Sequence, residues 1–216
     1  VDNRNVAEIT LVDRVREISS MKDVFISTNK NFEEIIKRQI PDFPEENILY
    51  EPARRDLAPA VGLNVLKLQQ MGINEPVAIL WSDHLIEKPK DFQNALKIGE
   101  SLINESPNRF VFTGEVPRFA NNNIGWINIG EKVEDRDVME VFKFEGWTYR
   151  PSIELCDELF DSGKAVWNTG YFVSSIDFMV NQYRLFMPEM TSQLEKIINN
   201  PELIDEIYPE LESISF

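Results

Sequence analysis

The stretch Val77-Ala78-Ile79-Leu80-Trp81-Ser82-Asp83-His84 places four aliphatic residues and a tryptophan before a serine, an aspartate and the only histidine of the 216-residue chain. A short apolar run of this kind is typical of a β-strand that is covered on both faces, as in a parallel sheet. Ligands in such folds bind beyond the carboxyl ends of the strands. The stretch therefore predicts both a buried strand and the position of a binding site.

On both sides of this stretch, short β-rich runs alternate with segments of helical periodicity. The predicted elements are strands over 24–28, 47–50, 109–113 and 171–173, a pair of strands over 126–129 and 138–144 that suits a ribbon, helices over 32–40, 58–71, 91–103 and 152–161, and two or three closing helices. Such alternation predicts an α/β fold, Rossmann-like and doubly wound, with a mostly parallel sheet and helices on both faces.

Composition narrows the class of protein. The 43% hydrophobic content suits one globular domain over residues 1–216, and no apolar run is long enough to span a membrane. The net charge of −15 disfavours a nucleic-acid partner, although one arginine cluster could still serve a small phosphorylated ligand. A single cysteine, Cys156, excludes an intrachain disulfide and a cysteine-based zinc site, and it fits a cytoplasmic location.

The first candidate site is the segment Glu51–Ala60, which follows a predicted strand and leads into a helix. Its adjacent Arg54 and Arg55 can grip phosphate through planar donors, and the helix start would add free amide donors. Asp56 can cap that helix, and Pro59 suits its first turn. Surface charge alone explains the two arginines equally well.

Asp83 is the second candidate. A carboxylate at the end of a buried strand is a natural Mg²⁺ ligand, because this ion needs few protein ligands beside substrate phosphates. Alternatively, Asp83 caps the next turn. His84 is more readily a structural hydrogen-bonding group than a catalytic base.

Two amide-rich loops are further candidates. Asn121–Trp126 could reach sugar hydroxyls or could be a simple turn. Trp167–Gly170 precedes another predicted strand, and Asn168 could donate and accept hydrogen bonds to a sugar. The 9 glycines are scattered and form no phosphate-binding loop. Cys156 is expected to be a core residue on a helix.

Taken in order, these segments resemble the mannose-1-phosphate guanylyltransferase family of sugar nucleotidyltransferases over nearly the whole chain. Glu51–Ala60 is similar to the family's Glu-Pro-x-x-Arg-Asn-Thr-Ala-Pro-Ala, with Asp56 and Leu57 replacing Asn and Thr. Trp81–His84 corresponds to Pro-Ala-Asp-His, and Trp167–Phe172 to Trp-Asn-Ser-Gly-Met-Phe.

Other family segments are matched more loosely. Ala120–Ile127 resembles Pro-Glu-Thr-Gly-Tyr-Gly-Tyr-Ile but keeps only Gly125 and Ile127, and Trp147–Pro151 resembles Phe-x-Glu-Lys-Pro. The chain closes on Ser213–Phe216, like the family's Ser-Ile-Ser.

The resemblance implies a nucleotide-diphospho-sugar transferase type of fold and a metal-dependent reaction. GMP from GTP would pass to mannose-1-phosphate, which gives a nucleotide-sugar and pyrophosphate; guanine and mannose are suggested by the family alone. The residues implied are Asp83 for Mg²⁺ or Mn²⁺ and catalysis, Arg150 for catalysis, Arg55, Asp56, Ala58, Pro59 and Ser82 for the nucleotide, and Gly125, Arg150 and Asn168 for the sugar phosphate.

The departures from the family are also informative. Nothing like the family's Gly-Gly-x-Gly-x-Arg loop precedes Glu8–Val15, and the second metal-binding aspartate would fall beyond Phe216. We therefore expect a domain truncated at both ends and inactive, or nearly so, as given. Tyr149, Asn121 and Asn123 replace family residues, which keeps open a non-catalytic relative that binds a nucleotide-sugar or regulates a partner. A sheet edge left unpaired would favour a homodimer.

Overall fold

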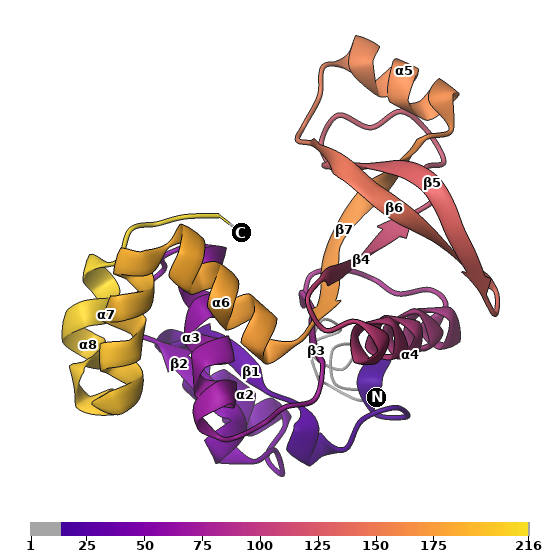
Figure 1. Cartoon of the computed structure of the whole chain (residues 1–216). Helices are drawn as coiled ribbons and strands as arrows, with labels where there is room; N and C mark the ends of the chain where they lie inside the picture. The colour runs from indigo at the N-terminus through magenta and orange to yellow at the C-terminus, as the bar shows by residue number, and fades with distance from the viewer. Residues whose placement is uncertain (1–13, 216) are drawn as a thin grey trace.

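The computed structural model describes residues 14–215, so most of Glu8–Val15 and the closing Phe216 lie outside the described residues. Two sheets form the framework (Figure 1). In the first, β1 (Ile26–Asn29) and β2 (Ile48–Glu51) pair in parallel. The second contains β3 (Val77–Ile79), β4 (Phe110–Glu115), β5 (Trp126–Arg136), β6 (Met139–Thr148) and β7 (Ala165–Ser174).

Strand β7 organises the second sheet. It pairs antiparallel with β3, β4 and β5, so β3 and β4 run in the same direction beside it. β5 and β6 form the expected ribbon, also antiparallel. The predicted α/β class with helices beside the sheets is confirmed, but the prediction of a mostly parallel sheet is wrong: among the described residues β1 and β2 pair in parallel, whereas the strands of the second sheet pair antiparallel. Hydrophobic periodicity identifies a strand without giving its direction, which is why the antiparallel course of β7 was not predicted.

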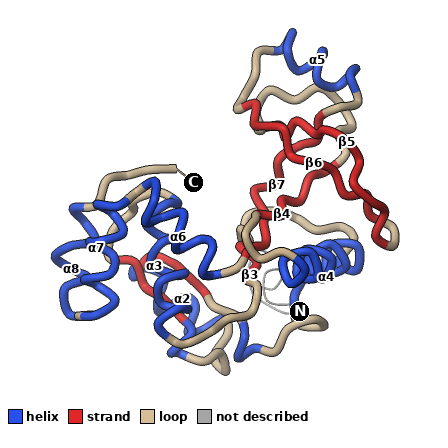
Figure 2. The backbone as a smooth tube through the Cα atoms, in the orientation of Figure 1, coloured by secondary structure: helices blue, strands red, loops and turns tan. Residues whose placement is uncertain are grey.

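Helices flank these sheets, as Figure 2 shows, with α4 beside β3 and α5 beyond one end of the β5–β6 ribbon. Their bounds are α2 (Glu33–Gln39), α3 (Leu57–Gln70), α4 (Pro89–Glu105), α5 (Ile153–Ser162), α6 (Ile176–Phe186), α7 (Pro188–Asn199) and α8 (Ile204–Ile207). Short 3₁₀ turns lie at Met21–Asp23, Lys30–Phe32, Glu45–Asn47, Pro201–Leu203 and Tyr208–Glu210. None of the helices described between residues 14 and 215 is long and apolar enough to cross a membrane.

Local chemistry sets the helix ends. Ser152 begins α5 by accepting a hydrogen bond from the Leu155 amide, and Gly163 ends it in the left-handed conformation. Pro188 stands in the first turn of α7, where its missing N–H costs nothing. These signals lie in neighbouring residues, so the predicted ends of α5 are confirmed.

In the part of the chain that the structure describes, three apolar clusters hold the elements together. The largest joins α3, α6 and α7 through residues such as Val65, Met179 and Leu194. The second packs α4 against the sheet, and the third, beneath α5, contains Trp126 and Cys156. Burial raises the pKa of the Cys156 thiol, which agrees with its predicted role as a core residue.

Strand β7 is longer than predicted and includes Trp167–Gly170, which was expected to form a loop. Gly170 has a φ of +75°, a left-handed conformation that interrupts the regular strand. The β4–β7 register shifts opposite it, between Phe112 and Gly114. An irregularity of this kind re-aims side chains, and it lies beside Asn168.

Candidate functional site

The turn after β3 carries Asp83, and its backbone carbonyls accept hydrogen bonds from the buried side chains of Arg14 and Tyr171. Arg14 donates from Nη1 to the Trp81 carbonyl at 3.4 Å and from Nη2 to the His84 carbonyl. The Tyr171 hydroxyl donates to the same Trp81 carbonyl at 3.4 Å. Burial raises the pKa of the Tyr171 hydroxyl, while the positive charge of Arg14 acts in the opposite direction. Tyr171 is therefore a neutral donor at ordinary pH.

Trp81 connects this turn to the predicted sugar-binding residues. Its indole Nε1 donates to the Gly170 carbonyl at 2.9 Å. Two residues before Gly170, the backbone N–H of Asn168 donates to the backbone carbonyl of Gly125 at 2.8 Å. The Asn168 side chain accepts from the Gly170 amide at 2.8 Å, which fixes its Oδ1 and orients the amide group. Asp83, Gly125 and Asn168, which are distant in sequence, thus belong to one connected assembly.

Arg150 lies just beyond β6 at the same end of the β5–β6 ribbon. Thr148 of β6 is the register partner of Trp126, the neighbour of Gly125. Arg150 is exposed, its φ is +42°, and its guanidinium lies 5.4 Å from the centre of the Tyr149 ring. Non-glycine residues in this conformation are strained and concentrate at functional sites.

The segment at the start of α3 differs from expectation in one respect. Asp56 is the N-cap, as predicted, and accepts from the Leu57 amide at 2.9 Å. The Ala58 amide, however, donates to the Ile214 carbonyl at 2.9 Å, and Pro59 has no amide hydrogen. The free amide donors predicted at this helix start are therefore largely occupied, because the C-terminal segment folds back onto it. Ala58 and Pro59 are themselves buried.

Because these amides are occupied, phosphate binding at the start of α3 would depend on Arg54 and Arg55. Arg54 is exposed, whereas Nε of the half-buried Arg55 is buried and has no hydrogen-bond partner among residues 14–215. Nearby, Tyr208 donates to Glu51 Oε2 at 2.7 Å, and burial together with this bond raises the pKa of Tyr208. A buried donor without an acceptor is rare in a folded protein, so Arg55 is suited to an acceptor from a ligand.

Metal-binding capacity at Asp83 is limited. Its side chain is 81% exposed, and Oδ1 lies 3.7 Å from His84 Nε2. The His84 ring packs edge-on against the Tyr171 ring, with 5.0 Å between the ring centres. Within the described part of the chain, no group of three or more His, Cys, Asp or Glu side chains is placed to hold a metal ion. Asp83 can thus offer one carboxylate, and a bound ion would need substrate oxygens as well.

In the amide-rich loop Asn121–Trp126, both oxygens of Asn121 accept hydrogen bonds from within the loop. The Asn121 side chain accepts from the Asn123 amide at 2.9 Å, and the Asn121 carbonyl accepts from Trp126 Nε1 at 2.9 Å. Ser82 is exposed beside Asp83.

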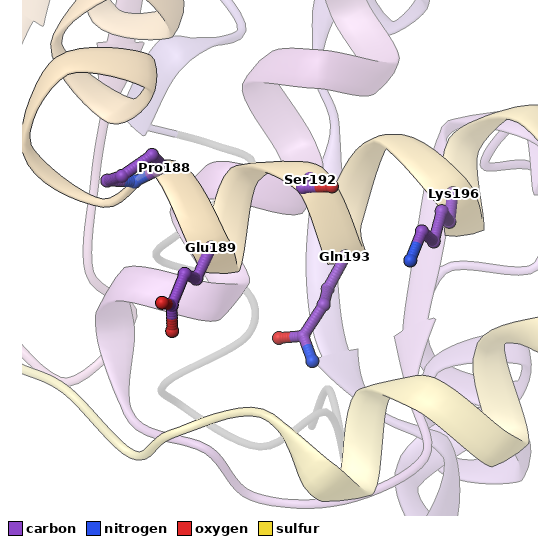
Figure 3. Close-up of a pocket in the computed structure, with 5 residues that line it drawn as sticks. All are labelled: Pro188, Glu189, Ser192, Gln193 and Lys196. Carbon is purple, nitrogen blue, oxygen red and sulfur yellow. The ribbon is translucent and has the colours of Figure 1, made fainter.

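A separate shallow space of about 440 Å³ lies along α7 (Figure 3), and no predicted site residue lines it. Its lining residues are Pro188, Glu189, Ser192, Gln193 and Lys196.

Sequence reasoning missed Arg14, Trp81 and Tyr171. The first lies 67 residues from Trp81, and nothing local marks it as a contact of the turn. Trp81 did carry a signal, because it stands where the resembled family has proline. The structure explains that tryptophan by its hydrogen bond to Gly170.

Comparisons with known proteins agree with this arrangement. The family model described as nucleotidyl transferase matches residues 4–209. A mannose-1-phosphate guanylyltransferase of Escherichia coli is 23% identical over 72% of this chain and 34% of its own length. Mannose-1-phosphate guanylyltransferase RfbM of Salmonella typhimurium is 27% identical over 89% of this chain and 40% of its own length. The chain therefore spans well under half the length of these curated relatives.

Solved structures support the fold. A crystal structure from Thermus thermophilus, described as a mannose-1-phosphate geranyltransferase, has a TM-score of 0.83 at 24% identity and covers 98% of this chain and 59% of that chain. A mannose-6-phosphate isomerase from Helicobacter pylori has a TM-score of 0.77 at 18% identity, over 100% of this chain and 83% of that chain. Since the family model covers nearly all of the sequence, the chain belongs to the nucleotidyl transferase family.

Proposed function

We propose that the chain is the nucleotide- and sugar-phosphate-handling part of an enzyme that transfers GMP from GTP to mannose-1-phosphate. The choice of guanine and mannose rests on the relatives, which are described as mannose-1-phosphate guanylyltransferases. The single observation that carries the binding role is the buried Nε of Arg55, just before the N-terminus of α3, which has no hydrogen-bond partner among residues 14–215.

In the proposed reaction, an oxygen of the sugar-1-phosphate attacks the α-phosphorus of the nucleotide. A new oxygen–phosphorus bond forms as the bond to the β-phosphate breaks, and pyrophosphate leaves with its electron pair. Such chemistry needs charge neutralisation and in-line positioning more than a protein nucleophile. Arg55 would bind the nucleotide, Arg150 the sugar phosphate, and Asn168 and Gly125 the sugar.

Mg²⁺ or Mn²⁺ would act at Asp83. One exposed carboxylate fits such an ion, because Mg²⁺ is commonly bound through one or two carboxylates, with substrate phosphates and water completing its shell. The ion would neutralise phosphate charge. Asp83 would fix the ion's position relative to Asn168, since Trp81 connects their two segments.

Thermal unfolding with and without ligand tests the binding role. GTP or GDP-mannose with Mg²⁺ should stabilise the chain, by about 2.7 kcal/mol at a ligand concentration one hundred times Kd. Arg55→Met should abolish most of the shift, since the guanidinium offers planar donors that methionine lacks. Arg54→Met is the matched control, because Arg54 is the exposed neighbour of Arg55 and its loss should change the shift little.

The outcomes separate two functions. A shift in the wild type and in Arg54→Met that disappears in Arg55→Met supports the nucleotide site. Equal shifts in all three proteins would show that Arg55 does not bind the nucleotide. Binding without transfer, in a protein extended at both ends, would favour the non-catalytic, nucleotide-sugar-binding relative.

A further inference from the structure

We propose that Arg14 is a positioning residue, which fixes the turn Trp81–His84 and thereby the direction in which Asp83 presents its carboxylate. The metal-related part of this proposal rests on the proposed function, in which Asp83 holds the ion. The part concerning the turn stands on the contacts of Arg14 alone.

The guanidinium bridges both sides of Asp83. It donates to the Trp81 carbonyl at 3.4 Å, two residues before the aspartate, and to the His84 carbonyl directly after it. Nη1 also donates to the Tyr171 hydroxyl at 3.5 Å, and that hydroxyl donates to Trp81 in turn. Three acceptors around one planar cation determine the turn's position relative to β7.

Arg14 is itself buried and hydrogen-bonded to α4. It is 4% exposed, and its backbone carbonyl accepts from Gln93 Nε2 of α4 at 2.9 Å. Asp83 is the opposite, with a side chain that is 81% exposed. Since packing does not fix the Asp83 side chain, its direction depends on the backbone of the turn, and the backbone depends on Arg14.

The sign of the effect on cation binding separates positioning from simple electrostatics. A positive guanidinium beneath a cation site repels the cation, so its removal should strengthen binding if charge were all that mattered. Loss of a positioning contact weakens binding instead, typically by about tenfold or more for groups that orient metal ligands. Lysine at position 14 would keep the charge but lose the fork of donors.

His84 provides a direct readout, because it is the only histidine and its imidazole proton signals need no assignment. Its ring lies 5.0 Å from the Tyr171 ring, and the aromatic ring current of Tyr171 shifts the His84 proton signals away from the chemical shifts of an unfolded peptide. In the full 216-residue chain, Arg14→Lys and Arg14→Met should move the His84 signals toward that position. Arg109→Lys is the matched control, because Arg109 also donates to two backbone carbonyls, those of Leu102 and Ser106.

Titration with Mn²⁺ alone adds the functional readout, since the paramagnetic ion broadens nearby protons. The wild-type His84 signals should broaden at low Mn²⁺, and Asp83→Asn should prevent it. Arg14→Lys and Arg14→Met should need about ten times more Mn²⁺ than the wild type or Arg109→Lys. Thermal unfolding of each variant confirms that it is folded at the measuring temperature.

Two results would overturn the proposal: unchanged His84 signals in both Arg14 variants, or equal or stronger broadening in Arg14→Met. A different result would count against the proposed function only. If Asp83→Asn is broadened like the wild type, Asp83 is not the metal ligand. The His84 signals then still decide whether Arg14 fixes the turn.

Discussion

Replacement of Gly170 by alanine tests the connection between the Asp83 turn and β7. Gly170 has a φ of +75°, and an added Cβ would lie 2.4 Å from Nε1 and 2.8 Å from Cδ1 of Trp81. The same Nε1 donates to the Gly170 carbonyl at 2.9 Å. Alanine would therefore introduce backbone strain, displace the indole and break this hydrogen bond.

Each of these effects costs about 1 kcal/mol: the left-handed conformation, the displaced rotamer and the lost hydrogen bond. We expect Gly170→Ala to lower the free energy of unfolding by about 3 kcal/mol. Gly72→Ala is the matched control, because Gly72 has the same φ of +75° and no atom within 4 Å of an added Cβ. Its expected loss is the strain alone, about 1 kcal/mol.

Urea unfolding followed by circular dichroism measures both variants and their combination with Trp81→Ala. In the Trp81→Ala background, Gly170→Ala should cost only about 1 kcal/mol, because the atoms that clash are gone. The reasoning is refuted if Gly170→Ala and Gly72→Ala differ by less than about 0.5 kcal/mol. The same conclusion would follow if removal of Trp81 left the cost of Gly170→Ala unchanged.

Three further predictions concern stability, each measured by urea unfolding. Asp56 has φ +65° and ψ −166°, a backbone conformation that glycine tolerates. Asp56→Gly should raise the free energy of unfolding by about 1 kcal/mol, and a lower free energy of unfolding would show that the Asp56 backbone is not strained. Hydrogen bonds from Arg136 lower the pKa of Glu105 below its usual 4.5, so the ionised Glu105 stabilises the folded state above its unfolded pKa, and this contribution is lost as the pH falls. Glu105→Gln should therefore reduce the fall in the free energy of unfolding between about pH 5 and pH 3. An unchanged pH dependence of the free energy of unfolding would contradict this prediction. Tyr208→Phe should cost about 2 kcal/mol, because Glu51 loses a donor at 2.7 Å; a neutral effect would show that water replaces it.

Several features could be read from the sequence because their causes are local. Val77–Leu80 is apolar enough to predict a strand, and β3 occupies Val77–Ile79. Asp56 was expected to cap a helix and does so. Ser152 and Gly163 mark the ends of α5. Motif order also predicted the family that the family model then matched over residues 4–209.

Tertiary structure alone decided the rest. The direction of β7 depends on which strands it meets, so the antiparallel pairing has no signature in its own residues. The Ala58 amide was expected to be free, but its acceptor is Ile214 at the far end of the chain. Arg14 likewise holds the turn of Asp83 from a distant part of the sequence, through the His84 carbonyl 70 residues away. Local propensity and capping are written in neighbouring residues, whereas a hydrogen-bond partner distant in the chain is chosen only by the packing of the whole fold.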